Sequence, residues 1–293
     1  MIHYMKIRVV YIFIAAACLL ALGILTMVMT RIKTRMDANK ITLPSIDDVQ
    51  AESWAKLAGK RIFFGHQSVG YNIVDGISDV MNERNYVKLN VLESRKTAAF
   101  DQPVFAHSQV GKNTDPVSKI ESFVKIMDAG AGEKLDVAFF KFCYVDIMRD
   151  SDPQKIFDAY SAALEDLKER YPEIRFIHVT VPLRSAPKGA GKKLKQSVKL
   201  LIGKPGVLED NIMRERYNRL LRAAFSETEP VFDLALIETV NPDGYRCYAA
   251  KGTRRVSVMV PEYTEDGGHL SDKGRKKIAE QLLIILAETA ETL

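Results

Sequence analysis

The amino-acid sequence predicts an α/β domain built on a mostly parallel sheet, and two patterns support this prediction. From residue 60 onward, short apolar runs alternate with segments of helical periodicity. These helical segments are long enough for the right-handed crossovers that join parallel strands. The chain of 293 residues, 47% of them hydrophobic and 27% charged, is also large and apolar enough for one well-buried core.

About five strands are predicted, at residues 60–64, 86–92, 135–145, 174–181 and 231–236. The second is apolar on one face only and is expected near a sheet edge, whereas the third is apolar throughout and is expected to be buried on both faces. Residues 107–116 are predicted to form a polar loop. Helices are predicted at 71–85, from Asp115-Pro116 to 127 with Asp115 as the N-cap, from Asp152-Pro153 onward, and at 209–225 and 271–288.

The N-terminal segment predicts a membrane anchor. Residues 9–30 are uncharged and rich in Ile, Leu, Ala, Val and Met, which is long enough to cross a hydrocarbon core of about 30 Å. Arg31 follows directly, without the small-residue cleavage site of a signal peptide, although processing at Cys18 as in a lipoprotein is the alternative. The predicted organisation is an anchor over 1–35, a linker over 36–57 and a body over 58–293.

The charge distribution points to no nucleic-acid surface, because the net charge is only +5 and part of it lies beside the apolar segment. Residues 184–206 form an insertion with basic side chains and no acidic ones. This insertion is either a solvated segment or a basic lid for an acidic substrate, such as a uronic-acid polymer or an anionic lipid surface. Three cysteines lie far apart, and neither a metal-ligand cluster nor a phosphate-binding loop is recognisable.

The first chemical motif is the end of the strand at residues 61–64, followed by Gly65-His66-Gln67-Ser68. A tight turn between a parallel strand and a helix lifts one side chain above the sheet edge, beside free backbone N–H groups. Ser68 is the side chain suited to use this place as a nucleophile. The alternative role of Ser68 is that of a helix N-cap.

The second motif is Asp266-Gly267-Gly268-His269-Leu270, just before the last predicted helix. A serine nucleophile needs a histidine to take its proton and a carboxylate to orient that histidine. Asp266 precedes His269 by three residues, so its carboxylate can reach Nδ1 and leave Nε2 free for the serine proton. The two motifs together predict a catalytic triad of Ser68, Asp266 and His269.

These two motifs, in this order and spacing, resemble the first and last sequence blocks of the SGNH (GDSL-type) hydrolase family. The resemblance extends from Arg61 to the C-terminal helix. It implies a three-layer, flavodoxin-like doubly wound fold and ester hydrolysis or acyl transfer with Ser68 as nucleophile. It also implies that Gly111 belongs to the second block, with the backbone N–H groups of Gly111 and Ser68 forming an oxyanion hole.

The chain departs from the family pattern at two places. The first block is one residue longer than Gly-Asp-Ser, and the third block, usually Gly-x-Asn-Asp, reads Cys143-Tyr144-Val145-Asp146. The side-chain amide that would complete the oxyanion hole is therefore missing, and Asn113 and Gln67 are the candidates to replace it. Asp146 either acts in the site or holds its loop.

Several further polar residues have two interpretations. His66, Gln67 and Tyr144 are predicted to contact substrate, with a loop-stabilising hydrogen bond as the alternative for His66. The remaining polar candidates are expected to be structural: His107 near the second block, His178 inside a strand, and Asn218 either exposed or packed on its helix.

The sequence therefore predicts a membrane-anchored serine esterase or O-acyltransferase that needs no cofactor or metal. The expected substrate is an O-acyl group, with O-acetyl as the particular expectation, on a polysaccharide. Basic residues flank the anchor on both sides, so charge counting does not fix its orientation. The body is placed outside the cytoplasm because a single N-terminal anchor usually carries an exported body of this kind. The alternative function is a non-catalytic module of the same fold that binds glycan or a partner protein.

Overall fold

The computed structural model describes residues 34–187 and 206–293. Residues 1–33 of the predicted anchor and most of the basic insertion lie outside these ranges, whereas residues 34 and 35, the end of the predicted anchor, belong to a β-strand. Among the helices of the described ranges, none combines the length and the apolar character needed to cross a membrane.

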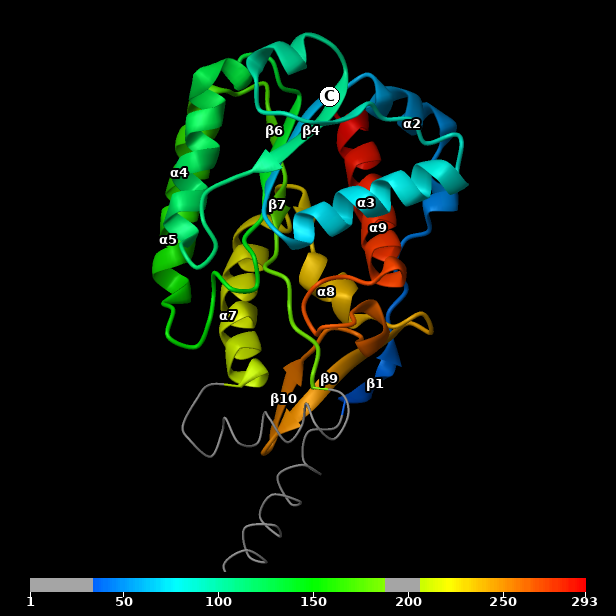
Figure 1. The fold of residues 1–293 in the computed structure, drawn as a ribbon, viewed down its shortest axis with the longest axis vertical. Helices are drawn as coiled ribbons and strands as arrows, with labels where there is room; N and C mark the ends of the chain where they lie inside the picture. Colours follow the sequence, from blue (N-terminus) through cyan, green and yellow to red (C-terminus); the bar gives the residue numbers. More distant parts are fainter. Residues whose placement is uncertain (1–33, 188–205) are drawn as a thin grey trace, which may run out of the picture.

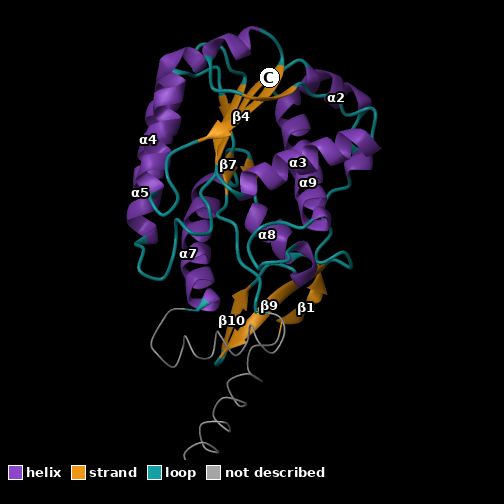
Figure 2. Ribbon diagram, in the orientation of Figure 1, coloured by secondary structure: helices purple, strands orange, loops and turns teal. Residues whose placement is uncertain are grey.

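A parallel five-stranded sheet forms the centre of the fold (Figures 1 and 2), which confirms the predicted α/β class. Its strands, in spatial order, are β3 (Val91–Glu93), β4 (Val104–Gln109), β2 (Arg61–His66), β5 (Val137–Phe140) and β6 (Arg175–Phe176). Directly after β6, β7 (His178–Val179) pairs in parallel with β8 (Val231–Phe232). Because all these strands are parallel, the loops after β2, β4 and β5 meet at one edge of the sheet.

Helices cover both faces of the sheet and make a three-layer arrangement (Figure 2). Apolar side chains alternate between the two faces along β2, so that Phe64 packs into one core and Phe63 into the other. The Phe64 core includes residues of α2 (Ala51–Ala58), α3 (Val69–Glu83), α8 (Leu234–Thr239) and α9 (Asp272–Glu291). The Phe63 core includes residues of α4 (Pro116–Ile126), α5 (Pro153–Arg170) and α7 (Val207–Phe225).

A second, antiparallel sheet was not predicted. It consists of β1 (Thr34–Lys40), β9 (Tyr245–Lys251) and β10 (Arg254–Ser257), with β9 in the middle. Residues 36–57, expected as a linker, therefore contribute to β1 and α2. The helix α2 packs on the domain because its apolar residues Trp54 and Leu57 lie on one face and are buried.

The differences within the main sheet have local causes. β4 replaces the start of a predicted polar loop, because its His107 and Ser108 are buried despite their polarity. In place of the predicted strand at 86–92, the structure has the short edge strand β3. In place of the strand predicted at 174–181, it has two short strands, β6 and β7. The strand predicted to reach residue 236 ends at Phe232, because Asp233 accepts a hydrogen bond from Leu236 N and caps α8.

Short helical turns complete the described chain: η1 (Ile46–Asp48), η2 (Thr97–Asp101), η3 (Met127–Ala131) and η4 (Pro261–Tyr263). The predicted N-cap at Asp115 and the predicted helix start at Asp152-Pro153 are confirmed, and Asp152 is an N-cap too. Asp115 accepts a hydrogen bond from Ser118 N, and Asp152 accepts hydrogen bonds from the N–H groups of Gln154 and Lys155.

Candidate active site

The structure brings Ser68, His269 and Asp266 together at the carboxyl edge of the sheet. Ser68 Oγ lies 2.6 Å from His269 Nε2, and His269 Nδ1 lies 2.6 Å from Asp266 Oδ2. Ser68 and His269 are 201 residues apart in sequence, so this contact depends on the whole fold. The order of the three groups is that of a hydroxyl, a proton acceptor and an orienting carboxylate.

Ser68 occupies a strained turn between β2 and α3. Its φ and ψ are 48° and −103°, a conformation that non-glycine residues rarely adopt. The turn is tight: a Cβ at Gly70 would lie 2.2 Å from the ring of His66. Ser68 is the N-cap residue of α3 by position, but its side chain makes no capping hydrogen bond. The N-cap interpretation of the Ser68 hydroxyl is therefore wrong.

Asp266 organises the loop that carries His269. Its Oδ1 accepts hydrogen bonds from the N–H groups of Gly268 and His269, each at 2.8 Å. Partial burial alone would raise the pKa of the Asp266 carboxyl, but hydrogen bonds from the His269 ring and from these backbone groups lower it well below its usual range. Asp266 is therefore an anion throughout the neutral pH range, as an orienting carboxylate requires.

Gly111 lies on the loop next to the Ser68 turn. Gln67 Nε2 donates to the carbonyl oxygens of Gly111, at 2.8 Å, and Val110, at 3.3 Å, and Val110 N donates to His66 O. The Gln67 side chain thus joins the two loops, and its amide nitrogen is engaged by the backbone of the second loop. The contact of Gln67 with substrate stays a prediction.

Asp146, the last residue of the third-block sequence, stabilises the loops around it. The buried Asp146 accepts hydrogen bonds from Thr114 N at 2.8 Å and Cys143 N at 2.6 Å, and it forms a buried ion pair with Lys119. Lys119 Nζ also donates to Oδ1 of the exposed Asn113 at 3.0 Å. Asp146 therefore ties the loop after β5 to the loop after β4, and Asn113 is held at that junction.

Replacement of Lys119 by Met is expected to lower the free energy of unfolding by about 3–5 kcal/mol, because it leaves the Asp146 carboxylate buried without its counter-charge. Urea unfolding of the purified full chain measures the effect. The double variant K119M/D146N, which removes both charges, is expected to recover part of the loss. A K119M protein as stable as the wild type would contradict this account.

His66 does not contact substrate as predicted, because its side chain is completely buried. His66 Nε2 lies 3.0 Å from His107 Nδ1, and its ring packs edge-on against Tyr71. Burial lowers the pKa of His66 to about 2, and the positive charge of Lys141 acts in the same direction. His66 is therefore a neutral structural residue, and His107 is its partner.

Two other polar candidates also have structural roles. The buried His178 lies between the Tyr160 hydroxyl at 2.8 Å and the Glu229 carboxylate at 3.0 Å. Asn218 is buried, not exposed, and exchanges two hydrogen bonds with the backbone of Val181. Its location confirms the packing alternative.

Tyr144, in contrast, lies beside the triad. The centroids of the Tyr144 and His269 rings are 5.9 Å apart, and the planes are nearly perpendicular. The same ring lies close to Gly268, where a Cβ would approach it to 2.9 Å. Sequence reasoning missed its neighbour Arg184, whose guanidinium carbon lies 5.3 Å from the Tyr144 centroid. Arg184 is the first residue of the basic insertion at 184–206, and no local pattern distinguishes it from the lysines that follow.

Glu238 has a buried carboxyl group close to the backbone of Leu183, the residue before Arg184. Its Oε2 accepts a hydrogen bond from Leu183 N at 2.7 Å, whereas Oε1 has no partner in the described chain. Burial raises the pKa of Glu238 to about 8, outweighing the Leu183 hydrogen bond and the charges of Lys141 and Arg214.

This raised pKa predicts a pH dependence of stability. Between the ordinary carboxyl pKa and about 8, the folded state binds a proton that the unfolded state has lost, so the free energy of unfolding falls as pH rises through this window. Glu238→Gln is expected to remove that dependence and to be more stable than the wild type at pH 8. Urea unfolding at pH 5 and pH 8 tests this, and a difference between the two proteins that does not change with pH would argue against it.

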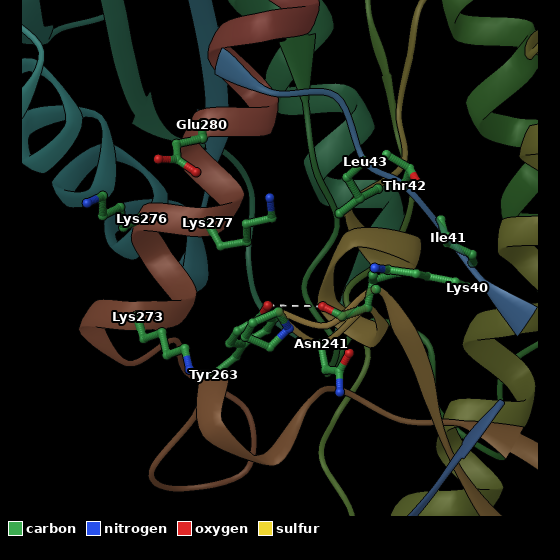
Figure 3. Close-up of a pocket in the computed structure, with 13 residues that line it drawn as sticks. Lys40, Ile41, Thr42, Leu43, Asn241, Tyr263, Lys273, Lys276, Lys277 and Glu280 are labelled. Carbon is green, nitrogen blue, oxygen red and sulfur yellow. Dashed lines mark hydrogen bonds between the residues drawn. The ribbon is translucent and has the colours of Figure 1, made fainter. Parts of the chain in front are cut away.

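A separate pocket of about 560 Å³ lies between the end of β1 and the first turns of α9 (Figure 3). Lysine side chains line it, including Lys40, Lys273 and Lys277, together with Tyr263 and Asn241. None of the triad residues contributes to this pocket, so it is not the acyl-binding site of the triad. Within residues 34–187 and 206–293, no group of three or more His, Cys, Asp and Glu side chains could hold a metal ion.

A parallel α/β domain with a Ser–His–Asp arrangement at the carboxyl edge of its sheet is the architecture of a serine-hydrolase site. Comparison of the sequence with protein-family models finds no match, and comparison with curated proteins finds none either. Comparison with solved structures does find similar chains, and they include one protein described as a member of the G-D-S-L family and one acetyltransferase domain.

Three of these structures illustrate the likeness. A Streptococcus pneumonia protein named for platelet activating factor is 14% identical, with a TM-score of 0.45 over 82% of this chain and 94% of its own. A G-D-S-L family protein from Desulfitobacterium hafniense DCB-2 is 11% identical, with a TM-score of 0.40 over 76% of this chain and 98% of its own. The periplasmic domain of a lipopolysaccharide acetyltransferase from Salmonella ser. Paratyphi A is 14% identical, with a TM-score of 0.36 over 75% and 81%. These likenesses concern the fold alone.

Proposed function

We propose that the protein is a serine esterase or O-acyltransferase with Ser68 as nucleophile, His269 as general base and Asp266 as the orienting carboxylate. The observation that supports this most strongly is the 2.6 Å contact between Ser68 Oγ and His269 Nε2, in a serine whose hydroxyl does not cap its helix. An N-cap serine would direct its oxygen to a backbone N–H of the first helical turn. Here the oxygen is directed to a proton acceptor.

In the proposed reaction, His269 Nε2 takes the Ser68 proton while Oγ attacks the acyl carbonyl carbon. The resulting oxyanion accepts hydrogen bonds from the backbone N–H groups of Ser68 and Gly111. Protonated His269 then gives its proton to the leaving alkoxide, and the carbon–oxygen bond to the alcohol breaks, leaving an acyl-serine. Water or a sugar hydroxyl, deprotonated by His269, attacks this ester and restores Ser68, which yields hydrolysis or acyl transfer.

The oxyanion hole proposed here has two backbone donors and no third-block asparagine. Asp146 occupies the neighbouring loop position and its oxygens already accept from Thr114, Cys143 and Lys119. One missing donor typically costs about 100- to 1,000-fold in turnover. We therefore expect slow turnover on small activated esters, and an assay must be able to detect rates that are lower by this factor.

The proposed substrate is an O-acetyl group on a polysaccharide outside the cytoplasm. The uncharged run at residues 9–30 supports a membrane-anchored body. His269 and Asp266 side chains are 47% and 57% exposed, which supports an open site that a polymer can reach.

Labelling with a fluorophosphonate tests the proposal, because the reagent reacts with activated serines. The full chain, purified in detergent, is expected to be labelled on Ser68, as identified by peptide mass analysis, and to hydrolyse a short-chain chromogenic ester. A protein that is neither labelled nor active would refute the esterase proposal. That outcome would favour the non-catalytic glycan- or protein-binding module.

A further inference from the structure

Arg184 is held in place by a buried asparagine. Asn211 is completely buried, and its side chain forms hydrogen bonds with both backbone groups of Arg184: Oδ1 accepts from Arg184 N at 3.0 Å, and Nδ2 donates to Arg184 O at 2.8 Å. A buried amide that is fully used in this way fixes the backbone and limits the directions in which the Arg184 side chain can extend.

The Arg184 side chain extends toward the triad loop. Arg184 Nε donates to Gly267 O at 3.3 Å, and Ser185 N donates to the same oxygen at 3.0 Å. The guanidinium lies over the ring of Tyr144, which in turn contacts the His269 ring edge-on. The Tyr144 ring therefore contacts both the Arg184 guanidinium and the His269 imidazole.

A second arginine, Arg214, supports this arrangement from the buried side. Arg214 is 1% exposed, donates through Nε to Tyr144 O at 2.7 Å and through Nη1 to Asn211 Oδ1 at 2.6 Å. Its guanidinium carbon also lies 5.8 Å from the Tyr144 centroid. Arg214 thus fixes both Tyr144 and the asparagine that fixes Arg184, and its own hydrogen-bonding capacity is directed inward.

The two arginines beside Tyr144 differ in their acidic neighbours. The buried Arg214 lies 3.9 Å from Asp210 and also near Glu238. No described carboxylate lies within ion-pair distance of the partly exposed Arg184. A guanidinium whose plane is set by an aromatic ring presents its outer N–H groups in a fixed fork, and this fork matches the two oxygens of a carboxylate.

We propose that Arg184 and Tyr144 form a subsite for a carboxylate group carried by the substrate, so that the acyl group removed or transferred belongs to an acidic, uronate-type sugar chain. This inference rests on the proposed function and adds the class of substrate. The openness of the triad favours a sugar polymer over a lipid, because a long acyl chain would need an enclosed apolar channel. Arg184 acts in binding, and it takes no part in the proton transfers at Ser68.

The test compares the charge at position 184 with the charge on the substrate. Acetylated polygalacturonate carries free carboxylates, whereas its methyl ester has the same backbone without charge. In the full chain, Arg184→Gln is expected to raise KM for the charged polymer about 10-fold, because a charge-assisted hydrogen bond at a partly exposed site is lost. Because R184Q also removes the hydrogen bond from Arg184 Nε to Gly267 O in the triad loop, the readout is the ratio of KM for the charged polymer to KM for the methyl ester, and this ratio is expected to rise about 10-fold. Arg184→Lys should restore part of the affinity.

The matched control is Arg219→Gln, which replaces an exposed arginine on α7. This variant should leave KM for the charged and for the methylated polymer unchanged. Equal losses of R184Q on the charged and the methylated polymer, or no loss on either, would overturn the carboxylate subsite while leaving the esterase proposal intact. If no ester is hydrolysed at all, calorimetric titration of Ser68→Ala protein with polygalacturonate oligomers decides the matter separately. Binding that is weakened about 10-fold by R184Q would support the subsite, and binding independent of residue 184 would refute it.

Discussion

Replacement of Ser68 by Ala is expected to reduce ester hydrolysis about 10,000-fold or more and to abolish fluorophosphonate labelling. The reason is that the acyl-enzyme cannot form without the Oγ that lies against His269. The remaining activity would come from binding and the backbone oxyanion donors alone. Initial rates on a short-chain chromogenic ester, measured with the full chain, give the ratio.

The control for this variant is Ser78→Ala, which changes an exposed serine on the same helix and should leave the rate unaltered. Circular dichroism of both variants shows whether the fold is retained. Since the Ser68 side chain makes no capping hydrogen bond, its replacement by alanine is not expected to destabilise the protein. A well-folded Ser68→Ala protein that keeps more than a tenth of the wild-type rate would exclude Ser68 as the nucleophile.

Asp266→Asn is expected to lower kcat by about 10,000-fold while leaving the shape of the site intact. A carboxylate accepts the N–H at His269 Nδ1 and keeps Nε2 free, whereas an amide can present a donor and favour the wrong tautomer. The measurement is kcat on the same ester across pH 5 to 9.

The lowered pKa of Asp266 gives this prediction a pH signature. A carboxyl with a folded-state pKa below its unfolded value stabilises the loop above that unfolded value and loses its effect only as pH falls through the lower, folded value. The wild-type rate should therefore not be limited by protonation of Asp266 above pH 5. Asp272→Asn, an exposed neighbour on α9, is the matched control. Similar losses in the two variants would mean that charge near the site, and not orientation of His269, is responsible.

The sequence was most informative where a few adjacent residues determine the outcome. Asp266 and His269 lie three residues apart in one loop, and aspartates before prolines mark two helix starts, so local chemistry was sufficient for these predictions. Ser68 could be placed by the strand–turn–helix pattern, but its contact with His269 needed the fold. The parallel sheet followed from the alternation of apolar and helical segments.

The remainder depends on contacts between distant segments. Lys119 and Asp146 are charged residues that pair in the interior, and a charged residue in a sequence is ordinarily expected on the surface. β4 was missed for a similar reason, because its buried His107 makes the strand look like a polar loop. Asn211, Arg214 and Arg184 meet only through the packing of α7 against the loop after β7.

The pairing of β1 with β9 has a consequence for how far the domain can travel. Residue 34 is already the first residue of a strand whose hydrogen bonds join it to the body, from Thr34 opposite Ala249 to Lys40 opposite Tyr245. A long flexible linker lets a domain move through a wide volume, whereas the residues of a paired strand keep a fixed position on their domain. Thr34 to Lys40 are therefore part of the body that carries Ser68, and these residues add no flexible length on its N-terminal side.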